Sequence, residues 1–355
     1  MTALKRFDEA LSQVREASKR PLSQWPVHLD RAGTQIYPHV KPLARMSDVF
    51  ALRAKALLAQ HRSEEALGEI RHALRVARSV EHQATTFPFS FRLSTWYKTL
   101  EVAEYGIASG LWDTAQLRTL PDEWAGIDVL GDLVFALDSQ RIDDNAYYEI
   151  LAEDRPRLAK LLTAPGETPS LKVTVFCHLI PTGRVRLHQV EYNRLIDLDL
   201  EDIDPAHAAI GPRFSRSIRL TTRNSRETLG MTRFLNSTVA PSNESTTYRA
   251  AATHTRLQQL TLQCALARYR NQHGSLPGTL DELVPDFVEG IPLDVMDGQP
   301  LRYRRTEDGG CLIWSVGPNR IDDGGKTSKS GKQLRRPFYK RKGDWVSVLP
   351  PIRNE

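Results

Sequence analysis

A change of pattern at Gly274 constrains the fold of this chain more than any other feature of its sequence. Residues 248–273 carry apolar side chains at helical spacing, and glycine favours the end of a helix. Beyond Gly274, closely spaced prolines and glycines divide the chain into runs that are too short for helices but suit strands. The pattern therefore predicts a long helix that packs on a small antiparallel sheet.

Two of these short runs, residues 301–304 and 311–316, flank a Gly-Gly turn and predict a β-hairpin. Residues 345–349 predict a further strand, so that the sheet would have three or four strands. Between the helix and the hairpin, Thr279 and Glu282 have the spacing of a capping box and predict one helical turn. Together these elements predict a compact head.

The order of motifs in this head resembles the globular head of the major pseudopilin of bacterial type II secretion. Its motifs are His-Gly-Ser-Leu-Pro, Leu-Asp-Glu-Leu-Val-Pro, Ile-Pro-Leu-Asp, Gly-Gln-Pro-Leu-Arg-Tyr and Ser-Val-Gly-Pro-Asn-Arg-Ile-Asp-Asp, within about residues 250–349. A pseudopilin also has an N-terminal processing site and a long apolar helix at the start of its chain, and neither is visible here. We therefore do not expect this chain to polymerise as a pseudopilin.

The resemblance implies a calcium site, because pseudopilin heads bind calcium in the loop that corresponds to residues 315–323. Calcium prefers several hard oxygen ligands, and Asn319, Asp322 and Asp323 supply them here. The alternative is an ordinary exposed turn, since turns use the same residue types. The family's loop continues with further acidic residues, whereas this chain continues with glycine, and Asp344 is a carboxylate that would have to fold back.

The N-terminal residues 1–165 predict an α-helical domain. Ser47 is placed to cap a first helix, and a second helix has an apolar face at steps of 4, 3, 4 and 3 formed by Ala66, Ile70, Ala73, Ala77 and Val80. The two helices predict a helical hairpin. Residues 87–91 interrupt the pattern, and a third helix is expected from about Ser94 to Gly110.

The middle of the chain is predicted to be a mixed connecting region over residues 166–247. It follows a Pro/Gly/Thr-rich linker, and its apolar run at 171–180 has the length of a strand. Residues 186–204 are ambiguous between helix and strand. With the head at 248–355, the fold class is α+β, a helical domain followed by a pseudopilin-like helix and sheet.

The basic charge of the chain is local. Net charge is +5, but eight Lys and Arg lie between Lys326 and Lys342 without one acidic residue, so the rest of the chain carries −3. Such a patch does not have the spread of a nucleic-acid-binding face, and no nucleic acid partner is expected. The segment predicts contact with an anionic lipid, a polyanion or a partner's acidic face, or alternatively a solvated loop.

The location of the protein has two interpretations. No run approaches the roughly 18 apolar residues of a membrane helix, and the N-terminus lacks the core of a signal peptide, so the chain taken literally is cytoplasmic. The order of hairpin, aromatic-bearing helices, head and terminal Gly-Asp-Trp-Val strand, however, resembles a group of uncharacterised bacterial proteins that usually begin with a membrane anchor. That resemblance implies the cell envelope or periplasm.

No catalytic site is predicted. The cysteines Cys177, Cys264 and Cys311 have no paired spacing, and the first two are expected to be buried small apolar residues. The acidic run at 197–204 indicates an exposed edge or solvated face. The leading hypothesis is therefore a non-enzymatic envelope protein for protein interaction or assembly, secretion-related by resemblance. A cytoplasmic helical adaptor is the alternative, and a hydrolase with a site between helical domain and head is the third.

Overall fold

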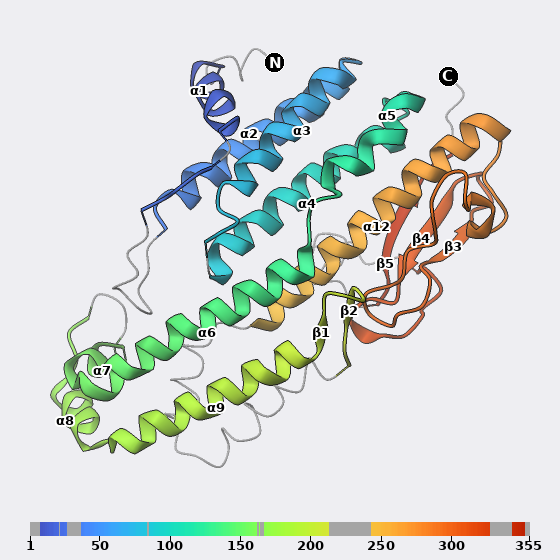
Figure 1. Cartoon of the computed structure of the whole chain (residues 1–355). Helices are drawn as coiled ribbons and strands as arrows, with labels where there is room; N and C mark the ends of the chain where they lie inside the picture. The colour runs from blue at the N-terminus through green and yellow to red at the C-terminus, as the bar shows by residue number, and fades with distance from the viewer. Residues whose placement is uncertain are drawn as a thin grey trace.

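The computed structural model describes residues 8–20, 22–26, 37–83, 85–161, 163, 167–212, 243–326 and 343–351. It has the α+β class, with long helices in an elongated array and a small antiparallel sheet at one end (Figure 1). The helices are α1 (Asp8–Ser18), α2 (Val40–Leu58), α3 (Ser63–Arg78), α4 (Thr86–Ala108), α5 (Thr114–Thr119), α6 (Val129–Glu153), α7 (Arg155–Leu161), α8 (Leu171–Leu179), α9 (Thr182–Glu201) and α12 (Asn243–His273).

The predicted hairpin and the strand after it are confirmed. Strands β3 (Arg302–Arg305), β4 (Cys311–Ser315) and β5 (Trp345–Leu349) form an antiparallel sheet in the order β3-β4-β5. Ile313 lies opposite Tyr303 on one side and Ser347 on the other. A second, smaller sheet pairs β1 (Ile203–Asp204) with β2 (Ala209–Ile210).

Helix α12 confirms the long helix predicted before Gly274. Gly274 follows the helix with φ +76°, a conformation that glycine adopts without a steric penalty. The capping-box prediction is also confirmed, because Glu282 Oε1 accepts the backbone N–H of Thr279 at 3.0 Å. The short helix η3 (Leu280–Leu283) therefore begins where the sequence placed it.

One hydrophobic core continues from the helical array into the head. It contains Leu57 and Ile70 of the helical hairpin, Leu100 of α4, Leu266 of α12 and Ile313 of β4, all of them buried. Burial of such side chains contributes about 25 cal/mol per Å² of apolar surface, so this shared core stabilises both parts together. The predicted boundary at residue 248 therefore falls inside α12, a helix that packs on both the helical array and the sheet.

The apolar run at 171–180 is a helix, α8, and the strand prediction was wrong. Ser170 caps the helix by accepting the backbone N–H of Val173 at 3.3 Å. Cys177 and Ile180 then lie on the buried side of the helix, in a cluster with Tyr148 and Tyr192. A short apolar run gives no periodicity that separates a strand from a helix, so the packing partners decide.

Three further predictions need correction. Helix α2 begins at Val40, so Ser47 is a buried residue within the helix and does not cap it. Helix α4 begins at Thr86 rather than near Ser94, because Pro88 lies in its first turn, where backbone N–H groups have no helical acceptor. The ambiguous segment 186–204 is mostly helix α9, which continues to Glu201. Within its acidic run Asp197 accepts from Arg141 at 2.7 Å, as an exposed face allows, but Asp199 is only 4% exposed.

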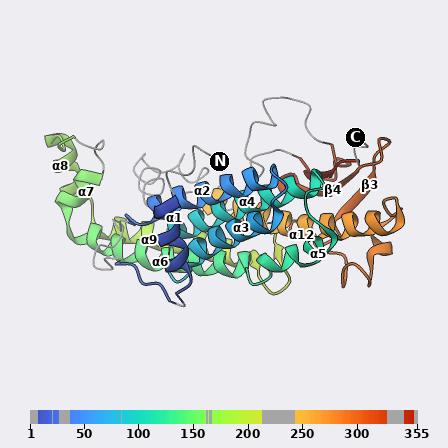
Figure 2. The same ribbon diagram turned by 90° about the horizontal axis from the view of Figure 1, so that it is seen from above.

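The molecule is elongated, and its two ends differ. Figures 1 and 2 both place α7 and α8 at one end and the β3-β4-β5 sheet at the other, with α6, α9 and α12 between them. In the part of the chain that the structure describes, no helix combines the length and the hydropathy needed to cross a bilayer.

Candidate functional site

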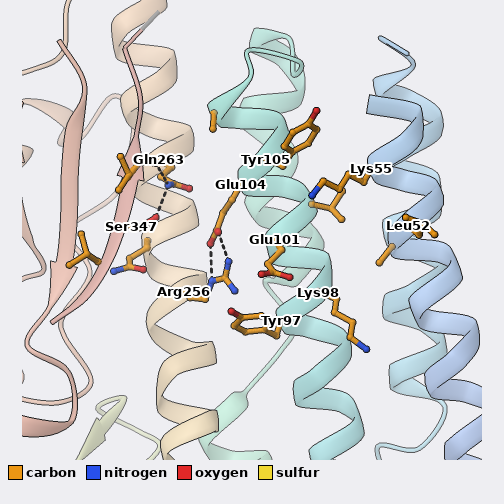
Figure 3. Close-up of a pocket in the computed structure, with 16 residues that line it drawn as sticks. Leu52, Lys55, Tyr97, Lys98, Glu101, Glu104, Tyr105, Arg256, Gln263 and Ser347 are labelled. Atoms are coloured by element: carbon orange, nitrogen blue, oxygen red, sulfur yellow. Dashed lines mark hydrogen bonds and ion pairs between the residues drawn. The ribbon is translucent and has the colours of Figure 1, made fainter. Parts of the chain in front are cut away.

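A groove of about 590 Å³ lies where α2, α4, α12 and β5 meet (Figure 3). Helix α2 lines it with Leu52 and Lys55, and α4 contributes Tyr97, Glu104 and Tyr105 among others. Helix α12 and strand β5 complete the lining with Arg256, Gln259, Gln263, Val346, Ser347 and Val348. The groove therefore lies on the seam between the helical array and the C-terminal sheet.

An ion pair joins α12 to α4 inside this groove. Arg256 Nε donates to Glu104 Oε1 at 3.0 Å, and Arg256 Nη2 donates to the other carboxylate oxygen. The guanidinium carbon lies 4.2 Å from the centre of the Tyr97 ring. Burial acts to lower the pKa of Arg256, but the Glu104 carboxylate raises it and the net direction is upward. The guanidinium thus stays charged although Arg256 is only 5% exposed.

Two glutamines of α12 that line the groove form hydrogen bonds with strand β5. Gln259 Nε2 donates to the carbonyl oxygen of Trp345 at 2.8 Å. Gln263 Nε2 donates to Ser347 Oγ at 2.7 Å (Figure 3). A carbonyl oxygen accepts only from the amide nitrogen, so this contact sets the orientation of the Gln259 amide. The Oε1 atoms of both glutamines are buried without a hydrogen-bond partner in the structure.

The remaining charges of the groove are mixed. Lys55 Nζ lies 5.0 Å from the centre of the Tyr105 ring, and Lys98 forms an ion pair with Asp48 at the rim. Glu101 adds a second carboxylate to that of Glu104. A groove with cations, carboxylates and two tyrosines does not select a polyanion. It suits a ligand with both donors and acceptors, such as a polypeptide.

The two edges of the C-terminal sheet differ in their chemistry. Edge strand β3 reads Arg-Tyr-Arg-Arg, whereas edge strand β5 reads Trp-Val-Ser-Val-Leu, without charge or proline. Charged side chains and proline are the usual means by which a sheet edge avoids pairing with another chain. Val348, 49% exposed, and Ser347 line the groove from β5. The uncharged edge strand therefore borders the groove, while Trp345, Val346 and Leu349 of the same strand are buried.

The three predicted calcium ligands lie at one corner of the head, next to the short helix η4 (Gly317–Asn319). Asn319 Nδ2 donates to Asp323 Oδ2 at 3.1 Å. Asp322 Oδ1 accepts from the indole N–H of Trp314 at 2.9 Å and from the backbone of Gly324 at 2.9 Å. The hydrogen bond from Trp314 is the main reason that the pKa of Asp322 lies below its ordinary value.

Asp344 does fold back onto this corner. Its two carboxylate oxygens accept the backbone N–H groups of Asp323 at 3.1 Å and of Gly325 at 2.7 Å. Burial raises the pKa of Asp344, and the charges of Asp322 and Asp323 raise it further. The corner thus gathers the hard oxygens that calcium prefers, although hydrogen bonds within the chain already use several of them.

Metal binding at the corner stays a prediction. Within the described ranges, no three His, Cys, Asp or Glu side chains are grouped so that they could hold a metal ion. A calcium site also uses amide oxygens, such as that of Asn319, and backbone carbonyls.

Asp294 is a residue that the sequence did not single out, although it ends the Ile-Pro-Leu-Asp motif. It is 1% exposed and accepts from Ser315 Oγ at 2.8 Å, from the backbone of Val316 at 2.8 Å and from Arg302 Nη1 at 2.9 Å. Burial raises its pKa, and the hydrogen bonds oppose that rise. Asp294 therefore ties the loop before β3 to the end of β4.

Other predicted features are either structural or outside the described residues. All three cysteines are buried and free, which confirms the interpretation of Cys177 and Cys264. The basic segment predicted to touch an anionic surface lies, after Lys326, outside the described residues. Comparisons of the chain with family models, curated proteins and solved structures found no match. We therefore interpret the site from its own geometry.

Proposed function

We propose that this chain is a non-enzymatic protein of the cell envelope that works in protein interaction or assembly, and that its groove binds an extended segment of a partner protein. The envelope location and the relation to secretion rest on the resemblance of the head to a pseudopilin. The groove includes Leu52 and Lys55 of α2, so the helical hairpin takes part in binding together with the head.

The observation that carries this proposal is the uncharged edge strand β5, with Val348 exposed, beside the groove. An extended peptide that lies alongside an edge strand gains main-chain hydrogen bonds, here with backbone groups of β5 other than the Trp345 and Val348 carbonyls, to which Gln259 and Gln263 donate. Three arginines in four residues protect the opposite edge, so the absence of charge on β5 is specific to the side with the groove.

Peptide selection tests the groove. The full chain is used to select binders from a library of random extended peptides, and the affinities of the selected peptides are measured by fluorescence polarisation. We expect Val348→Lys to weaken peptide binding at least about tenfold, because it places a charge on the uncharged edge strand β5. Ala108→Trp, which fills the groove from an exposed position on α4, should have a similar effect.

The matched controls are Leu293→Lys and Ala146→Trp, which lie outside the groove. Leu293 is 49% exposed, as is Val348, and belongs to the same part of the chain. Ala146 is exposed on α6. Peptides that bind both groove variants as tightly as the unchanged protein would contradict the proposal, and so would a selection without any binder.

Calcium stabilisation of the Asn319, Asp322 and Asp323 corner is the second part of the proposal. Asp322, Asp323 and Asp344 place like charges together, and a bound cation would relieve their repulsion. We expect calcium at 100 times its Kd to stabilise the protein by about 2.7 kcal/mol, seen as a rise in Tm by calorimetry.

The double variant Asp322→Ala/Asp323→Ala should lose this response to calcium. A matched double variant, Asp281→Ala/Asp286→Ala, removes two carboxylates from the same head and should retain it. If saturating calcium leaves the Tm of the unchanged protein where it was, the corner is an ordinary turn and the calcium hypothesis is abandoned.

A further inference from the structure

Helix α8 exposes a stripe of apolar side chains at the end of the molecule opposite the head. Leu171, Val175 and Leu179 recur every four residues and are 80%, 49% and 75% exposed. Phe176, 49% exposed, lies beside them. Residues four apart share one face of a helix, so these side chains form a continuous patch. Contiguous exposed apolar patches mark sites where a protein or a membrane binds.

The stripe is not part of the protein's own core. The opposite side of α8 fulfils that role, because Cys177 and Ile180 are buried and Val173 packs against the same cluster. A nine-residue helix that needs only one apolar side to dock thus carries apolar residues on two. Leu171 and Leu179 stay 80% and 75% exposed and contribute little to the packing of the chain, so an external contact is the physical reason for them.

The surroundings of the stripe are basic. Residues 153–190 contain six Lys and Arg against three Asp and Glu, although the chain outside the C-terminal basic segment has a net charge of −3. Lys160 and Lys172 are exposed, and Lys172 is part of α8 itself. The six basic residues are Arg155, Arg157, Lys160, Lys172, Arg184 and Arg186, of which Arg186 forms an ion pair with Glu149 of α6.

We propose that α8 docks this protein on an anionic membrane surface, with Leu171, Val175, Phe176 and Leu179 entering the interface. Helices that lie in the membrane interface combine Leu and Phe on one face with Lys and Arg around it. The end position matters as well, because both views show α7 and α8 projecting from the array, where a planar surface reaches them first. The inference does not depend on the groove.

Charge favours a lipid surface over a second copy of this chain. A second α8 would bring another basic surplus against the first, and like charges repel at such an interface. An anionic bilayer supplies the opposite charge and attracts basic residues near its surface. A monomer that binds vesicles is therefore the expected state.

Vesicle co-sedimentation of the full chain tests the proposal. The vesicles are phosphatidylcholine alone or with about 30 mol% phosphatidylglycerol, which supplies the negative surface charge. We expect binding to the anionic vesicles, and a loss of at least about tenfold in affinity for Leu171→Gln/Leu179→Gln, which removes apolar surface without changing charge. Glutamine also keeps the helix propensity close to that of leucine.

The matched control is Leu22→Gln/Leu293→Gln, at positions 81% and 49% exposed and away from α8. It should bind as the unchanged protein does. Equal binding by the α8 variant and the control would overturn the proposal, because the basic C-terminal segment would then explain the attraction alone. A dimer by light scattering that the α8 variant dissociates would overturn it in favour of self-association.

A local label provides the second readout. The native cysteines are buried, so a nitrobenzoxadiazole dye on Phe176→Cys reports on α8. We expect its emission to shift to the blue and to increase on anionic vesicles, as the dye enters an apolar environment. An unchanged spectrum on vesicles that sediment the protein would show that another surface binds them, and the proposal would fail.

Discussion

Replacing Glu104 by leucine is expected to lower the free energy of unfolding by about 3–5 kcal/mol, the range for a buried ion pair that loses one partner. Arg256 would lose the carboxylate that pairs with it while its guanidinium stays buried beside Tyr97. The side chains of Arg256 and Glu104 are 7% and 20% exposed, so water compensates little. Urea unfolding followed by circular dichroism measures the loss.

The double variant Arg256→Met/Glu104→Leu distinguishes two effects on the free energy of unfolding: the penalty of an unpaired buried charge and the net contribution of the ion pair. Replacing both partners by apolar side chains of similar size is often neutral, so we expect most of the stability to return. Lys19→Met/Glu16→Leu changes an exposed pair with 58% and 70% exposed side chains, and its effect should stay within about 1 kcal/mol. A loss in the double variant as large as in Glu104→Leu would contradict the explanation.

Asp144→Asn is expected to stabilise the protein at pH 8 and to have little effect at pH 4. Asp144 is 3% exposed, and burial raises its pKa from 3.8 to about 7 in the folded protein. Its carboxylate accepts from Tyr192 Oη at 2.5 Å and from Gln140 Nε2 at 3.0 Å. These hydrogen bonds oppose the shift without cancelling it.

The sign follows from proton linkage. Between pH 3.8 and about 7 the folded state holds the Asp144 proton more tightly than the unfolded state does. This contribution to stability is present at low pH and falls as pH rises through that window, to a limit of about 4 kcal/mol at about 1.4 kcal/mol per pH unit. Asparagine does not ionise, so the variant avoids this loss.

Thermal and urea unfolding at pH 4, 6 and 8 provides the measurement. Glu153→Gln, which neutralises an exposed carboxylate on the same helix, is the control and should leave the pH profile unchanged. If Asp144→Asn has the same pH profile as the unchanged protein, the carboxyl is not held in its protonated form.

The predictions that succeeded depend on signals within a few residues. Gly274 ends α12 because the chain needs a positive φ there, and the Gly-Gly turn joins β3 to β4. The contact between Thr279 and Glu282 spans three residues. Such features follow from backbone geometry and local hydrogen bonds, so the amino-acid order is sufficient to recognise them.

The predictions that failed depend on packing. Residues 171–180 have the composition of a strand, but α8 forms because Cys177 and Ile180 find partners on α6, α7 and α9. Helix α4 includes residues 87–91, which were expected to interrupt the helical pattern, since Phe89 and Phe91 pack into hydrophobic cores. Helix and strand propensities predict secondary structure poorly wherever the burial of side chains contributes more free energy than the local preference of the backbone.

The candidate groove could not be predicted from the sequence, for a related reason. Arg256 and Glu104 are 152 residues apart, and Gln263 and Ser347 are 84 apart, yet each pair is in contact. No motif marks such neighbours, because each residue is ordinary in its own segment. The acidic corner could be recognised in the sequence, since Asn319, Asp322 and Asp323 lie within five positions. Only the fold brings Asp344 to them.

The sequence by itself determined the local elements of this protein: the long helix, the capped turn, the hairpin with its third strand, and the helical hairpin near the N-terminus. The tertiary structure decided which faces of those elements are buried together, and with them the groove beside β5 and the apolar stripe that α8 leaves exposed. The physical reason is the separation along the chain between the residues that interact. Turns and caps are set by neighbouring residues, whereas burial depends on partners that lie far along the chain.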